Sequence, residues 1–471
     1  MKMPRVFVTA TARPTFDLDA ARERARAARE LLSSLGADVT GPTGLVLTPE
    51  DADAAAAELD PSADLVVNIC ASFSDAGPAL RLYSELRRPV LLWSFREPGP
   101  VGGRLRLNSL CGANLFGHAL VRAGGSVRLL YGDPWEPAVR EPLSAALEGE
   151  LPAAPELPAL QRERAPEGEV RAAVESLSGR RIGVVGDGPP GFTPSEYDAA
   201  TLRDVFGIEV ERLEVDEVFA RIDAVPETTV EEELAAATRV RPSLRGLDPA
   251  HTAGFAAVTS ALREWSAADV LAGVAVRCWP EFPTRLGVCP CSALSRLADE
   301  GTPTACERDV HGTVTMLLLE ALGSGPTYLV DTVDLDAADN VVRLWHCGSA
   351  ATALAADPEQ ATQSVHCNRR IGVAGDFALR TGPVVMARIT EESDCSGPTG
   401  LRLLIASGES VSEPNRFQGN TAAVRLDAPA AEFVHGLVTG GFPHHTVLAW
   451  TDVRPGLRAA ADIYGIPVIE W

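Results

Sequence analysis

The segment GTPTACERDVHGTVTMLLLEAL, residues 301–322, places acidic side chains directly before a strongly apolar run. Glu307 follows a short β-like stretch and precedes a predicted helix over 313–322, so it lies in a strand-to-helix turn. Sheets that alternate with helices bind their ligands at such turns. Asp331 ends the next predicted strand, in TYLVDTVDLD. A helix between two strands is typical of a βαβ crossover, which predicts that both carboxylates emerge at one sheet edge.

Two carboxylates at one sheet edge could hold a divalent cation and exchange protons, although Glu307 could instead cap the helix and Asp331 close a turn. GGFPHHTVLAW adds His444 and His445 at the start of a late strand. Neighbouring strand residues point to opposite faces, so at most one of them can face a given metal. His346, in LWHCG, occupies a comparable position beside glycine. Two carboxylates and a histidine suit Mn²⁺ or Mg²⁺ with open positions for substrate oxygens.

Residues 183–191, GVVGDGPPG, match the glycine fingerprint of dinucleotide-binding proteins. The two prolines that follow Gly188, Pro189 and Pro190, remove backbone N–H donors that a bound pyrophosphate needs. A nicotinamide-dependent oxidoreductase would also need a helix beginning directly after Gly188. We therefore favour a strand-end turn that exposes Asp187 over a nucleotide site.

The nine cysteines do not form the paired C-x₂-C units of a structural zinc site. Four of them, Cys278, Cys289, Cys291 and Cys306, lie close together in the sequence, and we expect them to be small buried residues. Their odd number and scattered spacing predict a chain without a disulfide framework, as in a reducing cytoplasm.

The composition excludes several classes of function. The net charge of −22 opposes a nucleic acid or an anionic membrane as the main partner. Lys2 is the only lysine, which excludes a Schiff-base enzyme, a pyridoxal phosphate aldimine and a P-loop lysine. No apolar leader precedes MKMPRVFVTA and no apolar run reaches membrane-spanning length, so we expect a cytoplasmic protein.

The order of predicted elements indicates an α/β protein with two doubly wound, Rossmann-like parallel-sheet domains and a C-terminal, mostly antiparallel and barrel-like β domain. Strands alternate with helices over residues 1–140, an Ala-, Pro-, Glu- and Arg-rich linker follows over 141–179, and the alternation resumes over 180–340. Residues 341–471 show short β-like segments between turns, then a helix and a closing strand.

The motifs TACERDVHGTVTMLL, YLVDTVD and GGFPHHTVLAW, in this order, resemble the L-fucose isomerase and L-arabinose isomerase superfamily, in its fucose isomerase-related branch. The resemblance implies that Glu307 and Asp331 are the two acidic metal ligands. It also implies a histidine ligand, for which we prefer His445 over His444. His346 aligns with a further family histidine that binds metal or substrate.

The segment GGRLRLNSLCGANLFGHAL, residues 102–120, resembles the family's first-domain segment that reaches the active site of a neighbouring subunit. Asn108 and Ser109 fall where polar substrate contacts are expected, and the GD turn of the second domain makes Asp187 a further candidate. Family members are hexamers or trimers with shared sites, so the resemblance implies a homo-oligomer.

The resemblance implies an aldose–ketose isomerase that needs Mn²⁺, or Mg²⁺ or Co²⁺, and no organic cofactor. One of Glu307 and Asp331 would remove a C–H proton and the other would move a hydroxyl proton, through a cis-enediol. Arg104 and Arg106 share one face and could read an anionic group, as in a 6-sulfo sugar such as sulfoquinovose, or could be solvated surface residues. The substrate would then be a 6-deoxy or 6-substituted aldose. The alternatives are a non-catalytic sugar-binding relative and, less favoured, the nicotinamide oxidoreductase.

Overall fold

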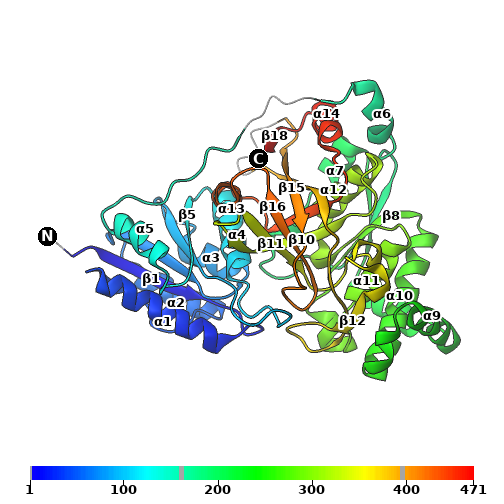
Figure 1. The fold of residues 1–471 in the computed structure, drawn as a ribbon, viewed down its shortest axis with the longest axis horizontal. Coiled ribbons are helices and arrows are strands. Elements are labelled where there is room, and N and C mark those ends of the chain that lie inside the picture. Colours follow the sequence, from blue (N-terminus) through cyan, green and yellow to red (C-terminus); the bar gives the residue numbers. More distant parts are fainter. Residues whose placement is uncertain (1–2, 159–163, 393–397) are drawn as a thin grey trace.

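Three β-sheets organise the chain, and each is built mainly from a different stretch of the sequence. The computed structural model describes residues 3–158, 164–392 and 398–471, which Figure 1 colours along the chain. The N-terminal sheet lies at one end of the molecule, the helices of the central part lie at the other, and the C-terminal strands lie between them (Figure 1). The structure confirms the predicted class of two parallel-sheet α/β units and a mostly antiparallel, barrel-like sheet.

The first sheet has five parallel strands in the order β2-β1-β3-β4-β5. Its inner strands are continuous apolar runs such as LVVNIC, buried on both faces, as expected for a parallel sheet covered by helices. The strands are β1 (Arg5–Thr11), β2 (Asp38–Thr40), β3 (Leu65–Cys70), β4 (Val90–Ser94) and β5 (Val127–Tyr131). The helices are α1 (Leu18–Ser34), α2 (Pro49–Glu58), α3 (Ala76–Tyr83), α4 (Ser109–Arg122) and α5 (Pro137–Leu147).

The second sheet has four parallel strands in the order β7-β6-β8-β9. The strands are β6 (Arg181–Val185), β7 (Glu209–Leu213), β8 (Leu271–Val276) and the two-residue β9 (Thr304–Ala305). The helices are α6 (Glu167–Glu175), α7 (Ala199–Phe206), α8 (Val215–Asp223), α9 (Glu227–Val240), α10 (Pro249–Ala268), α11 (Cys291–Asp299) and α12 (Val310–Ala321). Because β9 is short, the chain leaves this sheet just before the acidic turn.

The third sheet closes on itself. Strands β16, β11, β10, β17, β14 and β15 pair antiparallel in that order, and β15 pairs back onto β16, so six strands form a ring without free edges. The strands are β10 (Tyr328–Asp336), β11 (Val341–His346), β12 (Thr362–Val365), β13 (Gly372–Ala378), β14 (Gly382–Glu391), β15 (Leu401–Val411), β16 (Asn420–Leu426), β17 (His445–Ala449) and β18 (Val468–Glu470). Helices α13 (Ala430–Thr439) and α14 (Arg454–Tyr464) complete this part.

Strand β10 carries Asp331 into the barrel and not into the second parallel sheet. The predicted βαβ crossover between Glu307 and Asp331 is therefore wrong. Strand β10 instead finds antiparallel partners in β11 and β17, whose register places Trp345 and His445 opposite Asp331. Helix α12 leads from the end of the second sheet into the barrel, so the two carboxylates meet at a junction between sheets.

The segment predicted as a linker, residues 141–179, contains the end of α5 and all of α6, and α6 packs against α14. Its residues 159–163 lie outside the described part of the chain, as does Lys2.

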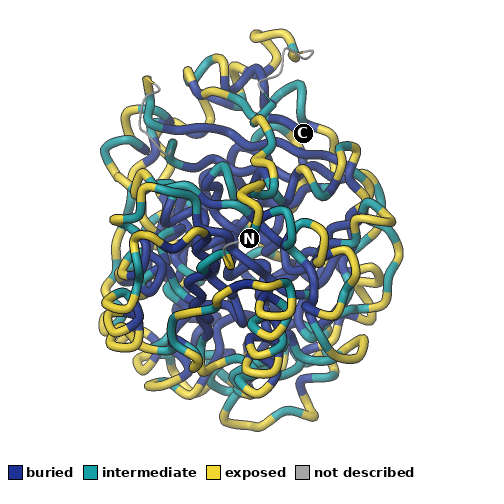
Figure 2. Tube along the Cα trace, turned by 90° about the vertical axis from the view of Figure 1, so that its left-hand side faces the viewer, coloured by how far each residue is buried: buried dark blue, intermediate teal, exposed yellow. Residues whose placement is uncertain are grey.

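Helix α4 joins the first sheet to the barrel. All of its residues from Ser109 to Leu120 are buried, and Phe116 and Leu120 belong to the same apolar cluster as Val434 and Leu437 of α13. Figure 2 shows buried segments gathered in the interior of the molecule, with exposed segments around them. The shared core holds the first domain against the barrel. No helix of the described residues combines the length and the apolar character that crossing a membrane requires.

Candidate active site

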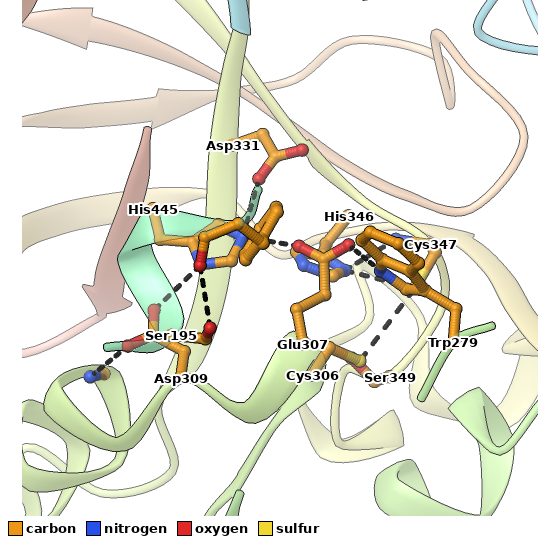
Figure 3. Close-up of polar contacts among 12 residues, drawn as sticks. Ser195, Trp279, Cys306, Glu307, Asp309, Asp331, His346, Cys347, Ser349 and His445 are labelled. Atoms are coloured by element: carbon orange, nitrogen blue, oxygen red, sulfur yellow. Dashed lines mark hydrogen bonds and ion pairs between the residues drawn. The ribbon is translucent and has the colours of Figure 1, made fainter. Parts of the chain in front are cut away.

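Glu307 lies in a strained turn between the second sheet and α12. The chain leaves β9, makes the 3-10 turn Cys306–Arg308 and enters α12 at Val310. Glu307 has a backbone φ of 61°, in the left-handed region that non-glycine residues rarely adopt. Such strain is commonly found where a functional side chain must be aimed. Here it sends the Glu307 carboxylate toward the barrel (Figure 3).

Asp331 and His445 come from neighbouring strands of the barrel and lie directly opposite each other in the register of β10 and β17. The His445 Nε2 atom lies 3.3 Å from Asp331 Oδ1 and 3.1 Å from Glu307 Oε2. Figure 3 shows the three side chains pointing toward one another. Residues far apart in the sequence thus present two carboxylates and an imidazole nitrogen to one point.

The converging atoms fit a divalent cation. Asp331 Oδ1 and His445 Nε2 are buried and have no hydrogen-bond partner among the described residues, and His346 Nε2 shares this state. Glu307, His346 and His445 also bring ligand atoms within 4.8 Å of one another. Cations with bonds of about 2.1 Å need neighbouring ligand atoms about 3 Å apart, and the separations of His445 Nε2 from Glu307 Oε2 and from Asp331 Oδ1 approach this value. Carboxylate and imidazole ligands suit Mn²⁺ and related ions.

Asp309 orients the imidazole of His445. Its Oδ2 lies 2.8 Å from His445 Nδ1 and also accepts a hydrogen bond from the fully buried Arg388. The other carboxylate oxygen, Oδ1, accepts the backbone N–H of Gly312 at 2.8 Å and so caps α12. With Nδ1 held by this carboxylate, the ring is oriented so that Nε2 faces Glu307 and Asp331. The sequence analysis missed this role, although Asp309 stands two residues after Glu307 in the same motif.

The carboxylates around His445 make this point favourable for a positive charge. Burial alone would raise the pKa of Glu307, but His445 and His346 outweigh it and lower that pKa. Burial alone would also raise the pKa of Asp331, but the nearby His445 and His346 lower it to about 2. Burial lowers the pKa of His445, but the three surrounding carboxylates raise it well above its usual value. A cation at this position offsets the repulsion between the carboxylates.

A cavity opens beside this cluster. Trp279 forms one wall, and its Nε1 donates a hydrogen bond of 2.7 Å to Glu307 Oε1, which fixes the carboxylate. Asn108 lines the same cavity, and its buried Oδ1 has no partner among the described residues. The predicted histidines are also here: His346 and His444 both line the cavity, and His444 packs edge-on against Phe192.

Other predicted substrate contacts lie elsewhere. Arg104 and Arg106 both bond to Asp17 Oδ2, at 3.3 and 2.7 Å, and do not line the cavity. The Ser109 hydroxyl accepts the Phe95 N–H at 2.8 Å and donates to the backbone, so its hydrogen bonds serve the fold. The structure therefore does not place these three side chains at the site, because neighbouring groups already satisfy them.

Asp187 also lies apart from the site. Its exposed carboxylate pairs with Arg212 at 2.9 Å. After β6 the chain forms only the short 3-10 turn Thr193–Ser195 before α7 begins at Ala199. A helix directly after Gly188, which a nicotinamide site requires, is not what this segment forms.

The first-domain segment contributes Asn108 to the cavity of its own chain. We expected the segment to reach the site of a neighbouring subunit. In the described chain, α4 is buried against the barrel of the same chain. That the segment also reaches the site of a neighbouring subunit stays a prediction.

The eight described cysteines are free and buried, and they include the four for which burial was predicted. Sequence reasoning did not foresee that four of them, Cys278, Cys289, Cys291 and Cys347, line the cavity. Contacts with neighbouring thiols, and then burial, raise the pKa of Cys278 and Cys347, and burial raises the pKa of Cys289, which keeps these thiols neutral.

Comparison with known proteins shows several relatives over nearly the whole chain. The sulfoquinovose isomerase of Alkalicoccus urumqiensis is 34% identical over 460 residues, which cover 98% of this chain and 97% of that protein. The sulfoquinovose isomerase of Priestia megaterium is 31% identical, with 97% of each chain covered. That of Clostridium sp. (strain MSTE9) is 31% identical, over 96% of this chain and 95% of the relative. No protein-family model matches the sequence.

Proposed function

The chain belongs to the family of the sulfoquinovose isomerases, and we propose that it is a metal-dependent isomerase that converts the aldose sulfoquinovose into the corresponding 6-sulfo ketose. The observation that carries the metal and the site is the convergence of Glu307, Asp331 and His445 on one point beside a cavity. The relatives supply the substrate class and the type of reaction.

Glu307, Asp331 and His445 would hold the cation, which we propose to be Mn²⁺, or Mg²⁺ or Co²⁺. When bound, it would polarise the C1 carbonyl and the C2 hydroxyl of the sugar and so acidify the C2–H bond. His346 is a further candidate for a ligand, since its Nε2 is unpartnered among the described residues.

The carboxylates of Glu307 and Asp331 move the protons. One takes the proton from C2 and delivers it to C1, and the other moves the proton of the C2 hydroxyl to the C1 oxygen. The two transfers convert an aldehyde and a secondary alcohol into a primary alcohol and a ketone without a net change in atoms or electrons. Their lowered pKa values keep both groups ionised and able to accept a proton. Trp279 holds Glu307 Oε1 and thereby leaves Oε2 facing His445.

The proposal includes a cytoplasmic homo-oligomer, a hexamer or trimer. The first domain and the barrel of one chain line the cavity, and we propose that the active sites lie at subunit interfaces, where a neighbouring subunit completes each site.

The direct test is to incubate the purified, Mn²⁺-supplemented protein with sulfoquinovose and to follow the sugar by proton NMR. Conversion to the 6-sulfo ketose, with loss of the C2 proton signal, is the expected result. Absence of conversion with each of the three cations would overturn the proposed function.

A further inference from the structure

A pair of arginines without carboxylate partners shares the cavity with the proposed metal ligands. Arg13 and Arg369 both line the cavity that contains Glu307 and Asp331. Neither guanidinium group forms a hydrogen bond or an ion pair with any of the residues that the structure describes. Arg388, by contrast, is paired with Asp309.

Arg13 stands next to the proposed catalytic carboxylate. It follows β1, and its backbone N–H donates to Ser72 Oγ at 3.0 Å. Its guanidinium carbon lies 4.2 Å from the centre of the Trp279 ring, the same indole whose N–H holds Glu307. Stacking on an aromatic face leaves the N–H groups at the rim of the guanidinium available to a ligand.

Arg369 reaches the cavity from the turn between β12 and β13. The ring of His366 ties this turn together: its Nδ1 accepts the backbone N–H groups of Asn368 at 3.2 Å and Arg369 at 3.4 Å. Burial and the nearby charge of Arg369 lower the pKa of His366 to about 4, so the ring is neutral and can accept these bonds. The turn therefore presents Arg369 at a defined position. The buried Oδ1 of Asn368, which also lines the cavity, has no partner in the described chain.

The positive charges of Arg13 and Arg369 repel each other. Burial is the main cause that lowers the pKa of Arg13, and the charge of Arg369 lowers it further. The through-space attraction of Asp75 and Glu307 acts the other way, but neither of them forms an ion pair with Arg13 among the described contacts. The cavity thus holds two arginines that lie close enough to repel each other, beside the carboxylates of Glu307 and Asp331. An anion bound between the two groups would relieve the repulsion.

We propose that Arg13 and Arg369 bind the sulfonate group of the sugar while its C1 and C2 end lies at Glu307 and Asp331. This inference rests on the proposed function and deepens it, because it names the residues that distinguish a 6-sulfo sugar from glucose. It replaces Arg104 and Arg106, which Asp17 holds outside the cavity. Guanidinium groups bind sulfonate oxygens through paired N–H donors, as they bind carboxylates and phosphates.

The experiment compares Arg13→Gln and Arg369→Gln with the parent protein, using sulfoquinovose and glucose as the two probes. We expect KM for sulfoquinovose, and its Kd by calorimetry, to rise about 10- to 100-fold in each variant, the usual effect of losing a hydrogen bond to a charged group. The kcat and the binding of glucose should change little. Arg370→Gln is the matched control, since Arg370 carries the neighbouring charge and bonds Gln418 outside the cavity.

Arg13→Lys and Arg369→Lys keep the charge and guard against misfolding of the glutamine variants; they should recover part of the affinity. Manganese content, measured on every variant, separates a lost sulfonate contact from a disturbed metal site. The inference is overturned if sulfoquinovose binds both glutamine variants as tightly as the parent, or if affinity for glucose falls in parallel. If the parent binds sulfoquinovose but does not convert it, the proposed function fails while the Kd comparison still decides the inference.

Discussion

Asp331 and His445 face each other across the antiparallel strands β10 and β17, with Asp331 Oδ1 3.3 Å from His445 Nε2. Glu307 approaches the same nitrogen from outside the barrel, at 3.1 Å. Two of the three proposed ligands are therefore fixed by strand register, and the third by a strained turn. A register shift of one residue would turn Asp331 or His445 to the opposite face of the sheet. The geometry of the site is thus tied to the closure of the barrel.

Glu307→Gln should lose stoichiometric manganese. The substitution removes one negative charge and the ligand oxygen that faces His445. We therefore expect the affinity for Mn²⁺ to fall about 10- to 100-fold and isomerisation to be lost. Mass spectrometry of the metal-loaded and desalted proteins measures the effect. Glu85→Gln, at an exposed position, is the matched control. Full manganese content in Glu307→Gln would remove Glu307 from the ligand set.

Trp279→Phe should reduce kcat while KM for sulfoquinovose changes less. Phenylalanine keeps an aromatic face for Arg13 but loses the N–H that donates to Glu307 Oε1. A freed carboxylate samples other rotamers, and we expect kcat to fall about 10-fold. Steady-state kinetics measure both constants. The control is Trp450→Phe, which loses a comparable hydrogen bond, to the backbone oxygen of Arg380. Trp450 does not line the cavity, so this variant should leave kcat unchanged. An equal loss in both variants would contradict a specific role for Trp279.

Glu320 should make the stability of the protein depend on pH outside the site. Burial raises the pKa of its carboxyl from 4.5 to about 7, against the hydrogen bonds from Thr327. A raised pKa in the folded state means that the contribution to stability is fully present below pH 4.5 and is lost as the pH rises toward 7. Between pH 4.5 and pH 8 the free energy of unfolding should therefore fall less in Glu320→Gln than in the parent. The difference between the two falls should be on the order of 1 to 3 kcal/mol.

Urea unfolding of the parent and of Glu320→Gln at the two pH values measures this difference. Glu264→Gln, at an exposed helical position, controls for the loss of a carboxylate. The same pH dependence in the parent and in Glu320→Gln would assign the effect to other groups.

Gly117→Ala should destabilise the contact between α4 and α13. A Cβ at Gly117 would lie 2.4 Å from the backbone oxygen of Val438, too close for any relaxed contact. We expect the free energy of unfolding to fall by about 1 to 3 kcal/mol, as overpacking of a core does. Gly168→Ala in α6 meets no atom within 4 Å and should instead be neutral or stabilising. Chemical denaturation of both variants and the parent measures this difference. A Gly117→Ala variant as stable as Gly168→Ala would show that α4 can move away from α13 without a loss of stability.

The sequence was sufficient for features that depend on local pattern. Buried apolar runs separated by helices predict parallel sheets, and the short segments after residue 340 predict the antiparallel barrel. The turn at Glu307 was also predictable, because a strand, an acidic residue and an apolar helix follow one another directly. The family motifs pointed to Asp331 and to one of two histidines, and the structure places His445 between the carboxylates and His444 against Phe192.

Tertiary structure alone decided which distant groups meet. Asp331 joins Glu307 through the barrel and not through a βαβ crossover, because strand pairing depends on partners more than a hundred residues away. The same holds for charge: Arg104 and Arg106 alternate in a suggestive way but are held by Asp17, whereas Arg13 and Arg369 carry no local signal and share the cavity. A sequence shows which groups are present, but whether a charge is already neutralised is set by the neighbours that folding brings to it.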